Sequence, residues 1–227
     1  MNAGNLPEGL PKNIKYLLDS DRKSQDNYKG MKYLLALDKK IIVSTLCAFI
    51  NNTHNKTVSR KNAIIFLAEN CPNENCPNEL YPIIEQILNQ DEPITDLLLG
   101  VLKALLKCPH PVILHRVIHF LEHKNRSIDI LIACARVLPI LDGVRASNSL
   151  EPYTLDNNLT KTLDKDLTEN SAENFRSVTM SSYAQILRND ALPILRRIAN
   201  DSKASARIRQ VALTEIHRVE SGYYNNH

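Results

Sequence analysis

The stretch LYPIIEQIL at residues 80–88 returns 33 residues later as ILHRVIHFL at residues 113–121. The agreement continues into residues 98–105 and 131–138, where apolar positions coincide at the same shift. The matched pairs are Leu80 with Ile113, Ile84 with Val117, Ile87 with Phe120, Leu88 with Leu121, Leu98 with Leu131, Val101 with Cys134 and Leu105 with Leu138. A fixed period of about 20–50 residues is typical of an α-solenoid, because one helix hairpin is too small to bury its own apolar face.

The same register extends toward both ends of the chain. It aligns the second helices on a column of small or medium residues, which we expect in equivalent buried places: Gly30, Ala63, Val101, Cys134 and Ala212. The sequence therefore predicts an all-α fold without β-sheet, an α-solenoid of about five stacked antiparallel helix pairs in one domain over residues 1–227. The pairs are expected near residues 10–38, 41–71, 79–108, 111–142 and 190–221.

Residues 145–178 interrupt this pattern with Ser, Asn, Thr, Asp and Glu and with only scattered leucines. A segment of this composition buries too little apolar surface to offset its ordering entropy. We therefore predict a polar, mobile insertion before the last pair. Its leucines could form a weak amphipathic helix on a partner or on the solenoid, through Leu150, Leu155, Leu159 and Leu163.

The composition limits the classes of protein to be considered. A hydrophobic content of 43% with no Trp suits a core of Leu, Ile, Val and Ala, as stacked helices use. The net charge of +3 lacks the basic excess of a general nucleic-acid binder. No apolar run is long enough to cross a membrane. The cysteine number is odd, and no apolar segment follows Met1, so we predict a cytoplasmic chain with reduced thiols.

A polar ridge is predicted along the second helices. The helices expected over residues 93–107 and 127–141 are apolar almost all round, and their charged residues fall on one narrow stripe. Such residues must face water or a ligand, and shifts of 33 and 111 residues carry the stripe into the last pair. We predict that this ridge binds a partner through Asp96, Lys103, Lys107, Asp129, Arg136, Arg207, Thr214 and Arg218.

The last pair resembles a HEAT repeat. ALPILRRIAND at residues 191–201 and IRQVAL at residues 208–213 match the family pattern through Pro193, Asp201, Arg209 and Ala212. The other units lack the complete Asp and Arg pair, so an armadillo-like or mixed array stays open. The resemblance implies a fold and not a function, because such arrays resemble one another across scaffolds, adaptors, transport receptors and a few enzymes.

Three histidines and two cysteines were weighed as metal ligands. His115, His119 and His123 are spaced to share one helix face, and a pair at i and i+4 can hold a metal if a neighbouring helix adds a ligand such as Glu85 or Gln86. A solvated face or a pH-sensitive partner surface explains them equally. Cys71 and Cys76 belong to a pentapeptide written twice, which indicates a structural loop. We predict no metal and no cofactor.

No catalytic motif is found. The chain has no glycine-rich phosphate loop and no Gly-x-Ser-x-Gly elbow, and it lacks the His-Glu dipeptides and tryptophans that two HEAT enzyme classes use. We predict a non-catalytic scaffold or adaptor that binds a protein or peptide along the ridge. The alternative is nucleic-acid or anionic-ligand binding through the basic last repeat, with Arg196, Arg197, Lys203, Arg207, Arg209 and Arg218.

Overall fold

The computed structural model describes residues 39–70, 77–90, 92–122, 127–141, 143–156 and 168–225. Within these ranges every regular element is an α-helix or a short 3₁₀ helix, and no strand occurs. This confirms the all-α class. The chain forms two compact units, unit 1 up to His110 and unit 2 from Pro111, and each is described by itself. The pair expected near residues 10–38, with Gly30, lies outside the described residues, and the continuity of one domain across both units stays a prediction.

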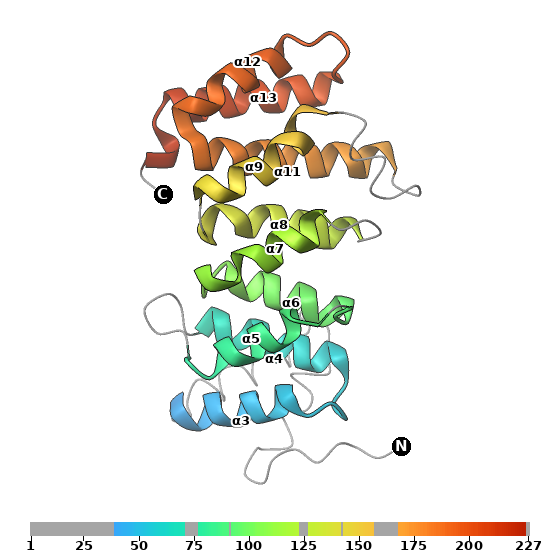
Figure 1. Ribbon diagram of the computed structural model, residues 1–227, viewed down its shortest axis with the longest axis vertical. Helices are drawn as coiled ribbons and strands as arrows, with labels where there is room; N and C mark the ends of the chain where they lie inside the picture. Colours follow the sequence, from blue (N-terminus) through green and yellow to red (C-terminus); the bar gives the residue numbers. More distant parts are fainter. Residues whose placement is uncertain are drawn as a thin grey trace, which may run out of the picture. The chain divides into compact units, whose positions relative to one another are not determined.

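Unit 1 holds two helix pairs in its described part (Figure 1). Helix α3 (Lys39–Asn51) pairs with α4 (Thr57–Asn70), and α5 (Leu80–Leu88) pairs with α6 (Thr95–Leu105). The two pairs meet through α4 against α6 and α3 against α5. Gly100 permits the close approach of α4 and α6, because a Cβ on it would lie 2.9 Å from Cγ of Lys61.

Unit 2 begins with a 3₁₀ turn, η2 (Pro111–Ile113), and then forms three helix pairs in its described part (Figure 1). Helix α7 (Leu114–Glu122) pairs with α8 (Ile128–Leu141), and α9 (Gly143–Leu155) pairs with α11 (Glu169–Leu187). A second 3₁₀ turn, η3 (Arg188–Ala191), leads into α12 (Leu192–Ala199), which pairs with α13 (Ala206–Glu220). Helix α11 contacts both α8 and α13, so the second helices of the three pairs lie in a row.

The interpretation of residues 145–178 as a mobile insertion is wrong where the structure describes them. Helix α9 and the first half of α11 cover most of this segment, and Leu150 and Phe175 are fully buried. Leu155 ends α9, whereas Leu159 and Leu163 lie outside the described residues. The segment therefore contributes a helix pair, and Thr179 of α11 precedes Ala212 of α13 by the same 33 residues that separate the clearest repeats.

The hydroxyl-rich composition of this pair explains the error. Serines and threonines usually favour caps and turns, since their hydroxyls compete for backbone hydrogen bonds. Here the hydroxyls donate to carbonyls of their own helix: Thr154 to Leu150 at 3.0 Å and Thr179 to Arg176 at 2.9 Å. A donor satisfied in this way can be buried without a partner elsewhere, and Thr154 and Thr179 are both fully buried. The polar pattern therefore does not indicate exposure.

The four described members of the predicted column are buried. Ala63 of α4, Val101 of α6, Cys134 of α8 and Ala212 of α13 are each 0% exposed, as is Thr179, which the 33-residue spacing adds to them. All five positions lie on second helices of their pairs. The burial expected for these column positions is thus confirmed within the described residues.

A recurring arginine joins the two helices of a pair. Three residues before Ala63, Thr179 and Ala212 stand Arg60, Arg176 and Arg209, listed here with their acceptors: Nε of Arg60 donates to the Ile50 carbonyl at 2.6 Å, Nε and Nη2 of Arg176 to the Thr154 and Leu155 carbonyls at 3.0 and 3.3 Å, and Nη1 of Arg209 to the Ala204 carbonyl. These carbonyls lie at the end of the first helix or in the turn after it. A cation there satisfies carbonyls that lack an intrahelical donor and interacts favourably with the negative end of the helix dipole.

Arg176 is the most deeply placed of these arginines, with only 2% of its surface exposed. Burial lowers the pKa of its guanidinium, while the negative charges of Asp201, Asp156 and Glu173 oppose that shift. Its Nη1 atom has no hydrogen-bond partner. Three nearby carboxylates and two carbonyls thus compensate one buried cation at the contact between α9 and α11.

We expect the Arg176→Ala variant to lose about 2–4 kcal/mol of unfolding free energy, because it removes a buried charged donor and leaves the end of α9 without it. Urea denaturation followed by circular dichroism measures this loss. Arg197→Ala is the matched control, since Arg197 is an exposed arginine of α12, and its effect should stay within about 0.5 kcal/mol. Equal stability of the two variants would contradict a structural role for Arg176.

We also expect slow amide hydrogen exchange in α11 from Phe175 to Ala184, because this stretch is packed between α8 and α13. Exchange measured by mass spectrometry should show protection of this stretch similar to that of α8 and much greater than that of the exposed turn around Ser202. Exchange of α11 as fast as that of this turn would restore the interpretation of the segment as mobile.

Candidate functional site

In unit 1 the predicted ridge is only partly free. Asp96 at the start of α6 forms an ion pair with Lys61 of α4, with 2.5 Å between Nζ and Oδ1. Both side chains are partly exposed, and a pair of this kind contributes at most about 1 kcal/mol. Lys103 and Lys107 are exposed. One of the three ridge residues of unit 1 is therefore held by a neighbouring helix.

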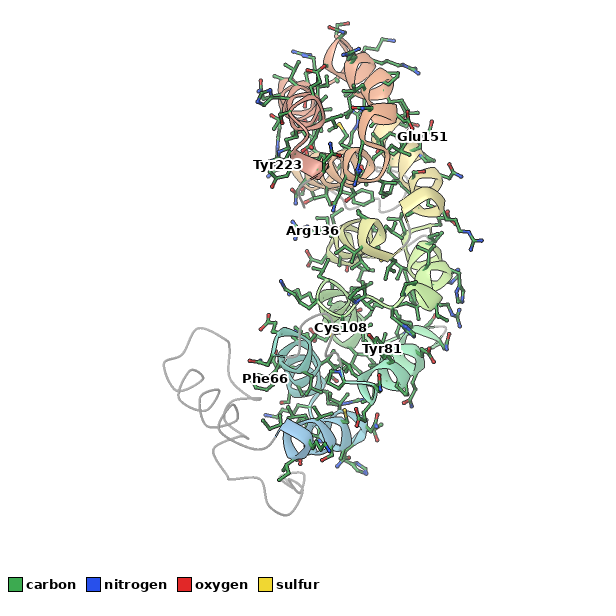
Figure 2. The ribbon with its side chains drawn as sticks, turned by 90° about the vertical axis from the view of Figure 1, so that its left-hand side faces the viewer. Phe66, Tyr81, Cys108, Arg136, Glu151 and Tyr223 are labelled. Carbon is green, nitrogen blue, oxygen red and sulfur yellow. The ribbon has the colours of Figure 1, made fainter. Side chains whose placement is uncertain are left out.

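In unit 2 three predicted ridge residues come together. Arg136 of α8 and Thr214 and Arg218 of α13 line one pocket with a volume of about 610 Å³, and α11 supplies much of its wall. The other residues around it are Ser177, Val178, Ser181, Ser182, Gln185, Gln210, Val211, Glu215, Tyr223 and Tyr224. Figure 2 shows Arg136 and Tyr223 on the same side of unit 2, whereas Glu151 of α9 points to the opposite side. We call this surface the second-helix pocket.

The remaining ridge residues of unit 2 lie outside the pocket lining. Asp129, in the first turn of α8, is exposed. Arg207, in the first turn of α13, donates to Oδ1 of Asn170 at 2.5 Å and lies 3.9 Å from a carboxylate oxygen of Glu173. The ridge charges of this unit thus divide into pocket residues and residues bound to a neighbouring helix.

Glu215 forms the buried floor of the second-helix pocket. Its side chain is 2% exposed, and its Oε1 accepts hydrogen bonds from Ser181 of α11 and from Nη1 of Arg218, both at 2.8 Å. Its Oε2 accepts a hydrogen bond from the hydroxyl of Tyr224. Three donors from α11, α13 and the C-terminal turn therefore meet on one carboxylate, which a buried charge requires.

This network fixes the charge of the neighbouring groups. The carboxylate of Glu215 raises the pKa of Arg218, against the opposite effect of burial. Burial raises the pKa of the Tyr224 hydroxyl, and its hydrogen bond to Glu215 acts in the same direction. Arg218 is thus a cation paired from below and Tyr224 a neutral hydrogen-bond donor.

The C-terminal turn completes one wall of the pocket. Gly222, with φ of 72°, adopts a backbone conformation that suits glycine and leads into η4 (Tyr223–Asn225). Tyr224 is anchored on Glu215, whereas Tyr223 is 47% exposed and has the guanidinium of Arg218 5.5 Å from the centre of its ring. An aromatic surface therefore stands beside the polar floor of the pocket.

Arg136 differs from the other arginine of the pocket. It is exposed, and no ion pair of the described residues includes it. Because Glu215 neutralises Arg218, Arg136 supplies the net positive charge of the pocket lining. The site therefore offers one available cation among hydroxyl and amide groups, which suits binding of a polar segment and supplies no evident set of groups for acid–base or nucleophilic chemistry.

The α11 residues of the pocket were missed from the sequence, although a signal for them exists. Ser181 precedes Thr214, and Gln185 precedes Arg218, by the same 33 residues as Arg136 follows Lys103. They are therefore the ridge positions of α11. The signal was lost because residues 145–178 were taken as an insertion, which removed α11 from the register.

The basic residues of the last repeat are mostly engaged. Arg196 forms an ion pair with Glu220 at 2.9 Å, and the remaining contacts are those of Arg207 with α11, of Arg209 with the Ala204 carbonyl and of Arg218 with Glu215. Arg197 and Lys203 are exposed. The positive charge that the sequence places at this end is thus largely balanced by local partners.

The histidine face is exposed where the structure describes it. His115 and His119 lie on the exposed side of α7, and His123 lies outside the described residues. Glu85, considered as a further ligand, instead accepts from or donates to Nε2 of His110 at 2.8 Å, and the ring of Tyr81 stacks on that of His110. Among the described residues no group of three or more His, Cys, Asp or Glu side chains is arranged to hold a metal ion.

The cysteines differ from the expectation of reduced thiols. Cys47 and Cys134 are free and buried, and burial raises the pKa of Cys47 to about 11, which makes it an unreactive thiol. Cys108 is disulfide-bonded, and its partner lies outside the described residues. The expectation is thus wrong for Cys108, and the cytoplasmic location predicted from it stays a prediction. None of the described helices is long and apolar enough to cross a membrane.

Removal of the Glu215 carboxylate should destabilise the protein, because Arg218, Ser181 and Tyr224 lose their common acceptor. We expect Glu215→Ala to cost about 2–3 kcal/mol of unfolding free energy, measured by urea denaturation. The matched control is Glu220→Ala on the same helix, where an exposed pair with Arg196 is lost and the cost should be at most about 1 kcal/mol. Equal losses in the two variants would show that Glu215 does not organise the pocket.

Comparison with known proteins adds no further information on family. No protein-family model matches the chain, and no curated protein and no solved structure matches it either.

Proposed function

We propose that this protein is a non-catalytic interaction scaffold of HEAT-like α-solenoid type, whose second helices bind a protein or peptide partner. The observation that carries the proposal is the second-helix pocket, where three side-by-side second helices present one available arginine and several hydrogen-bonding side chains. Extended arrays of helix pairs commonly bind partners along such a surface. No cofactor or metal is part of this proposal.

The solenoid architecture is supported by contacts within each unit. In unit 2 each second helix packs against the second helix of the next pair, α8 on α11 and α11 on α13, and α7 also contacts α9. In unit 1 α4 packs on α6 in the same way. Neighbour-to-neighbour packing, together with a repeated column and a repeated arginine, is what a stack of similar hairpins requires.

The resemblance to a HEAT repeat is supported by local geometry in the last pair. Pro193 lies in the first turn of α12, where a missing N–H costs no intrahelical hydrogen bond. Asp201 accepts a hydrogen bond from the Lys203 backbone in the turn, and Arg209 donates to the Ala204 carbonyl of the same turn. Each residue of the motif thus has a structural task at the turn between the two helices.

Nucleic-acid binding is the alternative, and the ion pairs of the last repeat weigh against it. Binding to a phosphate backbone needs several cations that are free to contact successive phosphates. In the last repeat Arg196, Arg207 and Arg218 are already paired with carboxylates. The partner-binding proposal needs only one free cation, which Arg136 supplies.

Site-specific photo-crosslinking tests the proposal. A photoreactive amino acid at Gln210, in the second-helix pocket, should crosslink partner protein in an extract of the producing cell, whereas the same amino acid at the exposed Asn148 of α9 should not. Crosslinks from Asn148 alone would place the partner elsewhere. Crosslinks to nucleic acid, together with retention on heparin that falls steeply with salt, would favour the alternative instead.

A further inference from the structure

We propose that the second-helix pocket selects an acidic peptide segment, with one carboxylate of the segment paired to Arg136 and an adjacent apolar side chain on Tyr223. This inference rests on the proposed function, because it names the chemistry of the partner that the second helices bind. It commits to a polypeptide and to one sign of charge.

The charge of the pocket determines the sign of the ligand. Glu215 is the acidic residue of the pocket lining, and its two oxygens are used by Arg218, Ser181 and Tyr224. Arg218 therefore has its counter-ion within the protein, whereas Arg136 has none among the described residues. A ligand carboxylate at Arg136 restores neutrality, while a ligand cation would face an uncompensated positive charge.

The hydrogen-bonding groups of the pocket fit a peptide backbone. Gln185 of α11 and Gln210 of α13 are exposed, and a side-chain amide both donates and accepts. An extended peptide presents alternating N–H and C=O groups that match such amides. The hydroxyl of Thr214 donates to the Gln210 carbonyl at 2.9 Å and retains its acceptor capacity toward the pocket.

Tyr223 provides the apolar part of the site. The ring is nearly half exposed, yet its position is held by the neighbouring Arg218 and by the edge-to-face contact with Tyr224 at 5.3 Å. A held aromatic ring binds an apolar side chain with little loss of conformational entropy. Val178 and Val211 add aliphatic surface to the same pocket.

A polyanion fits this pocket less well than an acidic peptide. Phosphate chains carry one charge for each residue, and the pocket lining contains one available cation beside a buried carboxylate. A single carboxylate flanked by apolar and amide groups matches the count. Nucleic acid is therefore an outcome of the test and not a second proposal.

An array of peptides of varied charge tests the inference. The peptides carry a central leucine or tyrosine, with Glu, Gln or Lys at each flanking position, and are probed with the full-length protein and with Arg136→Glu. The wild type should prefer the Glu peptides. Charge reversal at Arg136 should weaken their binding at least about fivefold and strengthen binding of the Lys peptides, because the electrostatic complementarity is inverted.

Two further variants separate the inference from the function on which it rests. Arg145→Glu reverses an exposed arginine of α9 and should leave every peptide affinity unchanged. Gln210→Trp fills the pocket with an uncharged ring and should reduce binding of all peptides. Thermal melts of the variants should match the wild type, because Arg136, Arg145 and Gln210 are all exposed.

The outcomes are distinguishable. If Gln210→Trp abolishes binding but wild type and Arg136→Glu share the same charge preference, the acidic ligand is wrong and the second-helix surface stands. If Gln210→Trp leaves peptide binding intact, or if the wild type binds single-stranded polynucleotide and no peptide, both the inference and the proposed function are overturned.

Discussion

A pair of short helices has two sides to bury and only one partner helix to bury them against. Helix α5 has 9 residues and α12 has 8, so neither can enclose an apolar core with its own partner alone. Each pair must pack against the next, and α11 shows the result, because it contacts α9 within its own pair, α8 on one side and α13 on the other. The fully buried Phe175 and Met180 lie on this helix. The fold of each unit depends on this requirement.

The same requirement explains the recurring arginine. Where two helices of a pair meet at a turn, the last carbonyls of the first helix point into a region that the next pair covers, so that water cannot satisfy them. Arg60, Arg176 and Arg209 solve this problem from the second helix. Leucines occupy the equivalent positions on α6 and α8, Leu98 and Leu131, and both are fully buried. Stacked pairs thus tolerate either an apolar contact or a carbonyl-binding cation at this place.

Packing on two sides leaves one face of each second helix uncovered. In unit 2 these faces meet as the second-helix pocket, which is polar because apolar side chains there would have no neighbour to contact. The buried Glu215 gives the pocket its asymmetry, since it binds Arg218 and Tyr224 and leaves Arg136 as the cation available to a ligand. Stability and recognition are therefore assigned to different charged residues of the same surface.

The sequence by itself determined the helical class, the 33-residue period and the buried column, because these follow from the spacing of apolar residues within one or two neighbouring helices. It also placed Arg136, Thr214 and Arg218 on a common face. Only the tertiary structure decided that α9 and α11 form a pair and that α11 completes the pocket. Hydroxyls that donate to their own helix carbonyls, as in Thr154 and Thr179, conceal buried positions in a polar sequence. The tertiary structure likewise decided which charges are available, since Lys61 and Asp96 are 35 residues apart and Ser181 and Glu215 are 34 residues apart. An ion pair depends on the distance between two side chains in space, and no periodicity of a single helix contains that distance.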